Sequence, residues 1–131
     1  LKVTKYFNNF SLFCGSDSLA LKVCKRGGAG AITATSNISA KLLSFILNNY
    51  RNESSINDFQ EYQFLQEKIR ETVFTDEPIR VLKAVMSIKN NNQDWNRVNP
   101  PLQKIIDPSS HKTVIALKEL LKKMDDLISS T

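Results

Sequence analysis

The chain has 131 residues, of which 41% are hydrophobic and 24% are charged, and its formal net charge is +5 at pH 7. This length suits one compact domain but excludes a complete eight-stranded βα barrel, which takes about 250 residues. The composition is typical of a globular protein rather than a disordered one, and no apolar run approaches the roughly 18 residues of a membrane-spanning helix.

The basic charge is spread along the chain rather than gathered in one patch. Its densest group, Lys118, Lys122 and Lys123, is interleaved with acidic residues, which is typical of a solvated helix face and does not favour nucleic-acid binding. No secretory signal opens the chain, and Cys14 and Cys24 suit reduced packing residues better than a disulfide. We therefore expect a cytoplasmic protein that binds neither nucleic acid nor membrane.

The first third of the chain is predicted to start with a strand and a helix. Residues 1–7 are typical of the end of a helix, and residues 10–14 form an apolar strand that stops at Gly15. Ser16 or Asp17 then suits the N-cap of a helix. This order predicts the first half of a βαβ unit.

A glycine cluster at positions 27, 28 and 30 ends this helix, and residues 31–35 form a second short strand. Both strands are apolar on successive residues, which indicates a parallel sheet covered on both faces and joined by a right-handed crossover. The glycines follow a helix and precede a strand, which is the reverse of the order in a phosphate-binding loop. They therefore indicate a tight turn.

The remaining residues show apolar positions at helical spacing. They predict a helix over 38–50 with Asn37 as its cap, a long helix over 56–73, a helix from Pro78, and a last helix capped by Asp107 with a proline at its first position. The predicted organisation is two βα units followed by three helices.

The chain lacks the motifs of metal catalysis and of Ser-His-Asp chemistry. His111, its only histidine, is predicted at the surface in the first turn of the last helix, and no His or Cys pair has metal-ligand spacing. Asp76 and Glu77 precede a helix, where stabilisation of the helix dipole explains them better than acid–base work.

Small and polar residues remain at the ends of both predicted strands. Gly15, Ser16 and Asp17 follow the first strand, and residues 33–37 end the second. In βα barrels the C-terminal ends of the strands hold the chemistry. A glycine there lets a small ligand approach the backbone, although it can equally serve only to turn the chain.

These segments resemble the C-terminal part of the dihydrodipicolinate synthase and N-acetylneuraminate lyase family, which are pyruvate-dependent class I aldolases with a (β/α)8 TIM barrel. The resemblance covers nearly the whole chain. It rests on Gly15-x-Asp17, on residues 27–37, and on residues 97–102, which are similar to the stretch before the family's final helix. It implies an α/β fold in which residues 1–54 form the last two βα units of the barrel and residues 55–131 form a C-terminal helical appendage.

The resemblance also implies a substrate and a site, without a cofactor. The wall of a pocket for pyruvate or another 2-oxo acid would be formed by Gly15, Ser16, Asp17, Ile32 and Thr33. In the family, a lysine on the sixth strand forms a Schiff base with pyruvate, and a tyrosine from the fifth strand moves protons. Neither has a counterpart among these residues.

Lys22, Lys25 and Lys41 fall on predicted helices, so we expect the catalytic lysine upstream or on a partner chain. The isolated chain is therefore predicted to be inactive, and it would associate with the missing N-terminal barrel segment or with itself to cover its strand edges. The alternative is a non-catalytic binding or regulatory module.

The sequence does not decide which aldehyde or sugar acid is the second substrate. Residues 80–83 resemble the lyase branch of the family, whereas residues 33–37 resemble the synthase branch.

Overall fold

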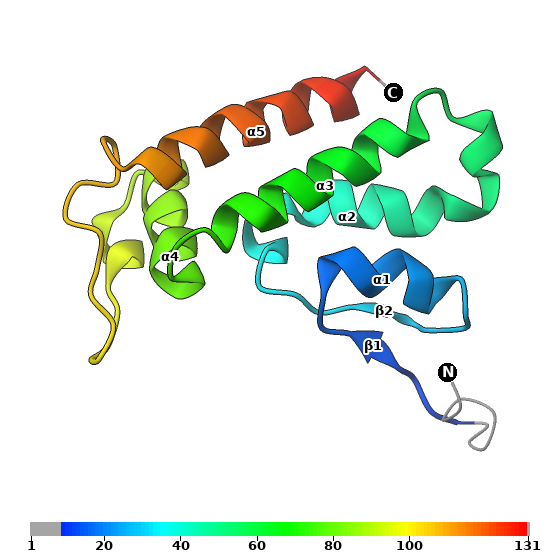
Figure 1. Cartoon of the computed structure of the whole chain (residues 1–131), viewed down its shortest axis with the longest axis horizontal. Helices are drawn as coiled ribbons and strands as arrows, with labels where there is room; N and C mark the ends of the chain where they lie inside the picture. Colours follow the sequence, from blue (N-terminus) through cyan, green and yellow to red (C-terminus); the bar gives the residue numbers. More distant parts are fainter. Residues whose placement is uncertain (1–8, 131) are drawn as a thin grey trace.

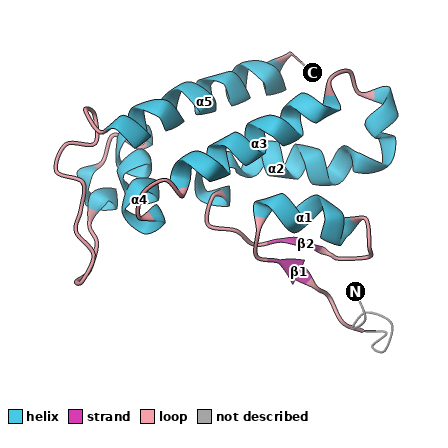
Figure 2. Ribbon diagram, in the orientation of Figure 1, coloured by secondary structure: helices cyan, strands magenta, loops and turns pink. Residues whose placement is uncertain are grey.

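A computed structural model describes residues 9–130, apart from the side chain of Ser55, so the helix end predicted over residues 1–7 lies outside the described residues. In chain order the elements are β1 (Phe13–Cys14), α1 (Asp17–Cys24), β2 (Gly30–Ala31), α2 (Ser36–Asn49), η2 (Tyr50–Ser55), α3 (Phe59–Val73), α4 (Pro78–Lys89), η3 (Gln93–Asn96) and α5 (Lys112–Ser129). The fold is mostly helical, and the two short strands lie together at one side of the molecule (Figure 2).

β1 and β2 pair in parallel, with Phe13 opposite Gly30 and Cys14 opposite Ala31. α1 connects the two strands and lies over one face of the pair, between the strands and the longer helices (Figure 1). The predicted βαβ unit and its parallel pairing are therefore confirmed.

Both strands are shorter than predicted. β1 lacks the first three residues of the expected strand, and β2 ends at Ala31 rather than at Thr35. The Ile32 amide donates a further hydrogen bond to the Cys14 carbonyl at 2.9 Å. The chain then bends into a helical turn, because the Thr35 side chain points inward to Asp17 instead of continuing the strand.

The two faces of the strand pair differ in burial. Cys14 and Ala31 pack against the helices, in a small cluster that includes Leu43 of α2. On the other face Phe13 is 52% exposed and Ile32 is 73% exposed. The sequence predicts that both faces of the strand pair are covered, whereas the described residues cover only the face of Cys14 and Ala31.

The glycine turn after α1 is the tight αβ turn that the sequence predicts. Gly27 has a φ of +89°, and the Gly28 amide donates to the Val23 carbonyl at 2.9 Å, which is the arrangement that ends many helices. A Cβ at Gly28 would lie 2.9 Å from the Val23 carbonyl oxygen. Close approach of the backbone therefore requires glycine at this position.

One hydrophobic core joins α2, α3, α4 and α5. Each helix contributes a fully buried side chain to it: Leu42, Ile69, Val81 and Leu117, respectively. Because α2 directly follows β2, this core also fixes the strand pair relative to the later helices. Within the described part of the chain, no helix combines the length and apolarity needed to cross a bilayer.

The predicted start of α4 is confirmed and that of α2 is wrong. α4 starts at Pro78, and the Glu77 side chain caps it by accepting a hydrogen bond from the Arg80 amide at 3.0 Å. α2 has Thr35 rather than Asn37 at its N-cap. Its first turn starts early because the chain already bends at the end of β2.

Unlike α2, the last helix starts later than predicted. Asp107 accepts a hydrogen bond from the Ser109 amide at 3.0 Å, but this closes a separate turn, and α5 starts only at Lys112. His111 occupies the N-cap and is half-buried, with Nε2 3.4 Å from the Asp76 carboxylate. The prediction of a surface histidine inside the helix is therefore wrong.

The Asp76 carboxylate joins the starts of α4 and α5. It accepts hydrogen bonds from the Glu77 amide at 2.6 Å and from the Arg80 guanidinium at 2.7 Å. The hydrogen bond from the Glu77 backbone contributes most, and that from Arg80 next, to holding the pKa of Asp76 below its ordinary value. A carboxyl group whose pKa is lower in the folded state than in the unfolded state stabilises the fold at pH values above its unfolded-state pKa. This stabilisation is lost as the pH falls through the folded-state pKa.

We therefore expect Asp76→Asn to lower the melting temperature more at pH 7 than at pH 3, because the wild-type carboxylate loses its stabilising contribution as the pH falls. Thermal unfolding followed by circular dichroism measures the difference at each pH. The matched control is Asp126→Asn, an exposed carboxylate on α5, which should change little at either pH. An equal loss at both pH values for Asp76→Asn would contradict the assignment.

Candidate functional site

The residues predicted to line the site follow the two strands directly: Gly15, Ser16, Asp17, Ile32 and Thr33. The parallel register pairs Cys14 with Ala31, so Gly15 and Ile32 lie next to each other just beyond the strands. Ser16 is the N-cap of α1, and Asp17 is its first residue.

Gly15 and Ile32 are open to solvent on the uncovered side of the strands. Within the described part of the chain, nothing lies within 4 Å of a Cβ built on Gly15, and its φ is outside the left-handed region. Neither packing nor backbone conformation therefore requires glycine here. The described residues supply one wall of any pocket on this side.

Asp17 is buried, and its carboxylate binds the end of the second strand. Oδ1 accepts a hydrogen bond from the Thr33 hydroxyl at 2.7 Å, and Oδ2 accepts one from the Thr35 hydroxyl at 2.5 Å. Because Asp17 follows β1 and both threonines follow β2, the carboxylate ties the two strand ends together.

α3 supplies the other partners of this carboxylate. Gln66 Nε2 donates to Asp17 Oδ1 at 3.2 Å and to Ser39 Oγ at 3.1 Å, and Ser39 in turn donates to the Thr35 carbonyl. Arg70 Nε lies 3.9 Å from Asp17 Oδ2. Hydroxyl, amide and cationic partners offset the cost of burying a charge. We call the following residues the Asp17 network: Asp17, Thr33, Thr35, Ser39, Gln66 and Arg70.

Sequence reasoning missed the contribution of α3 to this network. Gln66 is 4% exposed and lies on the buried face of α3 with Tyr62 and Ile69. A glutamine on that apolar stripe, one helical turn after Tyr62, was the available signal. Its partner Asp17 is 49 residues away, and no local pattern identifies such a partner.

The described residues offer no activated thiol and no metal centre. Cys14 and Cys24 are free and buried. Burial raises the pKa of the Cys24 thiol, and neighbouring Cys14 raises it further, so Cys24 stays protonated at neutral pH. No three His, Cys, Asp or Glu side chains of residues 9–130 gather closely enough to hold a metal ion.

The lysines nearest in sequence to the strand ends are not presented to them as nucleophiles. Lys22 and Lys41 are exposed on α1 and α2, and Lys25 forms an ion pair with Glu53 at 2.8 Å. The strand ends therefore offer an open backbone surface at Gly15 and Ile32, and none of these three lysines lies there as a nucleophile.

Residues 2–123 match the model of the dihydrodipicolinate synthetase family. The 4-hydroxy-tetrahydrodipicolinate synthase of Staphylococcus epidermidis is 32% identical over 82 residues, which is 60% of this chain and 27% of that protein. The chain thus spans only a part of the length of the curated relative that it matches.

Solved structures of similar proteins show the same arrangement of elements. N-acetylneuraminate lyase from Fusobacterium nucleatum, crystallised with pyruvate, superposes with a TM-score of 0.73 at 26% identity, over 94% of this chain and 40% of the lyase. A Sulfolobus 2-keto-3-deoxygluconate aldolase reaches the same TM-score at 18% identity, over 98% of this chain and 42% of the aldolase. The second likeness concerns the fold alone.

We expect Thr35→Val to lower the free energy of unfolding by about 1–3 kcal/mol, because one oxygen of the buried Asp17 carboxylate loses its donor. Urea unfolding at pH 7 measures the change. Thr72→Val on the surface of α3 is the matched control, since the Thr72 hydroxyl bonds only to its own helix, and the expected change is within about 0.5 kcal/mol. Equal losses in the two variants would contradict a special role for Thr35.

Proposed function

The chain belongs to the dihydrodipicolinate synthetase family, and we propose that it completes a (β/α)8 barrel that holds pyruvate or another 2-oxo acid for Schiff-base lyase or aldolase chemistry. In this proposal β1 and β2 are the last two strands of the barrel. Residues 1–54 belong to the barrel, and residues 55–131 form its helical appendage. The observation that supports the proposal most is the parallel strand pair with helices on one face and exposed side chains on the other.

Gly15 supports the assignment of the pocket wall. No described residue occupies its side-chain position, and neither packing within residues 9–130 nor φ explains the glycine. A ligand lying against the backbone between Gly15 and Ile32 would explain it, because a Cβ there would occupy the ligand's space. Ser16 and Thr33 flank this position, and the Asp17 carboxylate fixes Thr33 by accepting a hydrogen bond from its hydroxyl. Pyruvate in the structure of the Fusobacterium lyase supports a 2-oxo acid as the ligand.

The nucleophile is proposed to lie on the part of the barrel that this chain does not contain. In the Schiff-base reaction, a neutral lysine amine attacks the ketone carbon of the 2-oxo acid and water leaves, so that the adjacent carbon can lose a proton. The strand ends described here would orient the acid for that attack. The solved lyase is long enough to hold further strands, since this chain covers 40% of it.

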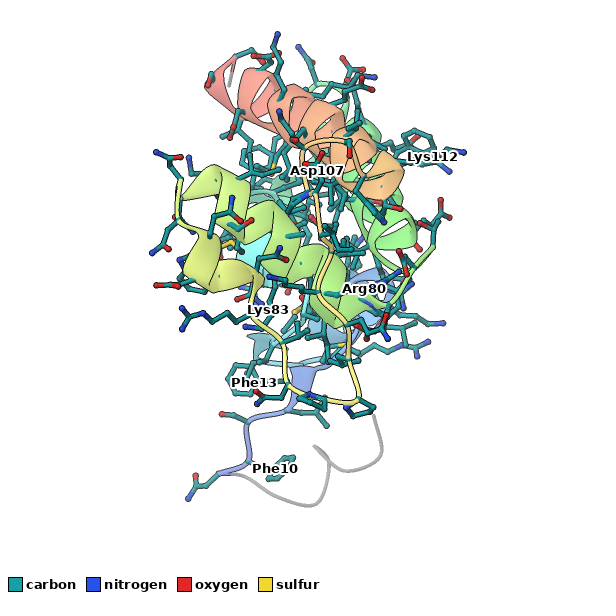
Figure 3. All side chains as sticks on the ribbon, turned by 90° about the vertical axis from the view of Figure 1, so that its left-hand side faces the viewer. Phe10, Phe13, Arg80, Lys83, Asp107 and Lys112 are labelled. Atoms are coloured by element: carbon teal, nitrogen blue, oxygen red, sulfur yellow. The ribbon has the colours of Figure 1, made fainter. Side chains whose placement is uncertain are left out.

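The uncovered surfaces fit association with such a missing part. A cleft of about 600 Å³ runs along the free side of β2, between residues 28–31 and the small residues Ala40 and Ser44 of α2. Phe10 and Phe13 project at the end of the molecule opposite α5 (Figure 3). A further strand and helix of the barrel would cover both regions and pair the free strand edge.

Reductive trapping with pyruvate and borohydride tests where the nucleophile lies. The isolated chain, incubated with both reagents, should show no adduct by mass spectrometry. A full-length relative such as the Fusobacterium lyase should be labelled under the same conditions, and serves as the positive control. Labelling should fall on a lysine outside the segment that aligns with this chain.

Stoichiometric labelling of the isolated chain at Lys22, Lys25 or Lys41 would contradict the proposal. Substitution of the labelled lysine by arginine would then show whether that residue is responsible. Labelling that persists without pyruvate would identify a reaction unrelated to Schiff-base formation.

A further inference from the structure

We propose that the cleft between α4 and the loop after η3 is a docking site for a peptide segment that carries an acidic residue beside apolar residues. The cleft has a volume of about 530 Å³, with α4 on one side and residues 97–102 on the other. This loop projects beside α4 at the left-hand side of Figure 1. Gly15 and Ile32 do not line the cleft, so it is separate from the 2-oxo acid pocket proposed above.

Most of the residues that line the cleft are apolar. Ile79, in the first turn of α4, is 50% exposed, although its side chain is large and apolar. An exposed apolar surface of this kind marks a place where another molecule binds. The loop adds four apolar residues to the lining: Val98, Pro100, Pro101 and Leu102.

Two more exposed apolar side chains flank the same loop. Trp95 is 46% exposed and Ile106 is 92% exposed. The Asn96 side chain closes the base of the loop between them by donating a hydrogen bond to the Ile105 carbonyl at 2.7 Å. A small molecule in the cleft would leave both side chains in water, whereas a peptide that lies across the loop would cover them. Their exposure therefore favours a peptide as the occupant.

The charge of the cleft selects an acidic partner. Its lining contains Lys83 and Arg97 and, among the described residues, neither aspartate nor glutamate. Arg97 forms a surface ion pair with Asp94 at 2.8 Å, whereas Lys83 has no ion pair within residues 9–130. Lys83 extends from α4 beside the loop (Figure 3). A carboxylate of the peptide would pair with this ammonium group, and such charge complementarity gives an interface its specificity.

The loop is ordered without a partner. The Leu102 amide donates a hydrogen bond to the Asn99 carbonyl at 3.0 Å, and residues 100 and 101 are prolines, whose rings fix φ. A surface that is already ordered loses less conformational entropy on binding than a flexible one. The cleft is therefore prepared to receive a peptide.

Selection of peptides from a random phage-displayed library on the immobilised chain tests this chemistry. We expect the enriched peptides to share an aspartate or glutamate next to two or more apolar residues. A synthetic copy of an enriched peptide should bind the chain in solution, as measured by fluorescence anisotropy. A version with lysine in place of the acidic residue should bind at least about tenfold more weakly.

Variants of the chain show whether the peptide occupies this cleft. Lys83→Glu should weaken binding of the acidic peptide about tenfold and strengthen binding of its lysine version. Lys89→Glu changes an exposed lysine at the end of the same helix, outside the cleft, and should leave the affinity unchanged. Ile79→Asp should weaken binding at least about tenfold, whereas Ile115→Asp, at an exposed position of α5, should not.

The proposal is overturned if no peptide is enriched, if the enriched peptides show no excess of acidic residues, or if Lys83→Glu and Lys89→Glu weaken binding equally. It is also overturned if light scattering shows a dimer of the chain that Ile79→Asp separates, because a second copy would then occupy the cleft. If Ile79→Asp does not fold, Lys83→Glu still decides the outcome, because Lys83 is partly exposed. None of these results depends on pyruvate trapping, so the two proposals fail separately.

Discussion

The buried carboxylate of Asp17 connects the parts of this molecule that have little else to hold them together. Each strand has only two residues in the sheet, and a ladder this short has marginal stability in water. Asp17 adds hydrogen bonds from both threonines after β2, and Gln66 brings α3 onto the same carboxylate. Since breaking a buried charged pair is strongly unfavourable, this network fixes one arrangement of strands and helices.

Around this network the two sides of the molecule are built differently. The helical side has a continuous apolar core, and the strand ends are attached to it through α2 and the Asp17 network. The opposite face of the strands has exposed Phe13 and Ile32. The proposal that these strands belong to a larger barrel rests on this open face, because parallel sheets are normally covered on both faces.

The features that the sequence predicts correctly are those with local causes. The βαβ order, the glycine turn at Gly27 and Gly28, and the start of α4 at Pro78 each depend on neighbouring residues. The start of α5 was predicted wrongly because Asp107 is a genuine capping residue, but it caps a short turn that ends before the helix. Local capping signals alone cannot distinguish these two outcomes.

The site could be predicted only in outline. That Gly15 and Thr33 lie together at the strand ends follows from the parallel βαβ pattern. The burial of Asp17 and the participation of Gln66 do not follow, because they depend on where α3 packs, and the two residues are 49 positions apart. Contacts between segments distant in sequence are set by the whole core rather than by any local pattern.

A double-mutant cycle between Asp17 and Gln66 tests most directly whether this network couples strands and helices. Asp17→Ala, Gln66→Leu and the double variant are unfolded in urea at pH 7, and the coupling is the departure of their free energies from additivity. The account predicts a coupling of about 1–2 kcal/mol, since the residues share a buried charged hydrogen bond. Additivity within about 0.3 kcal/mol would mean that the two residues act independently, and it would contradict the account.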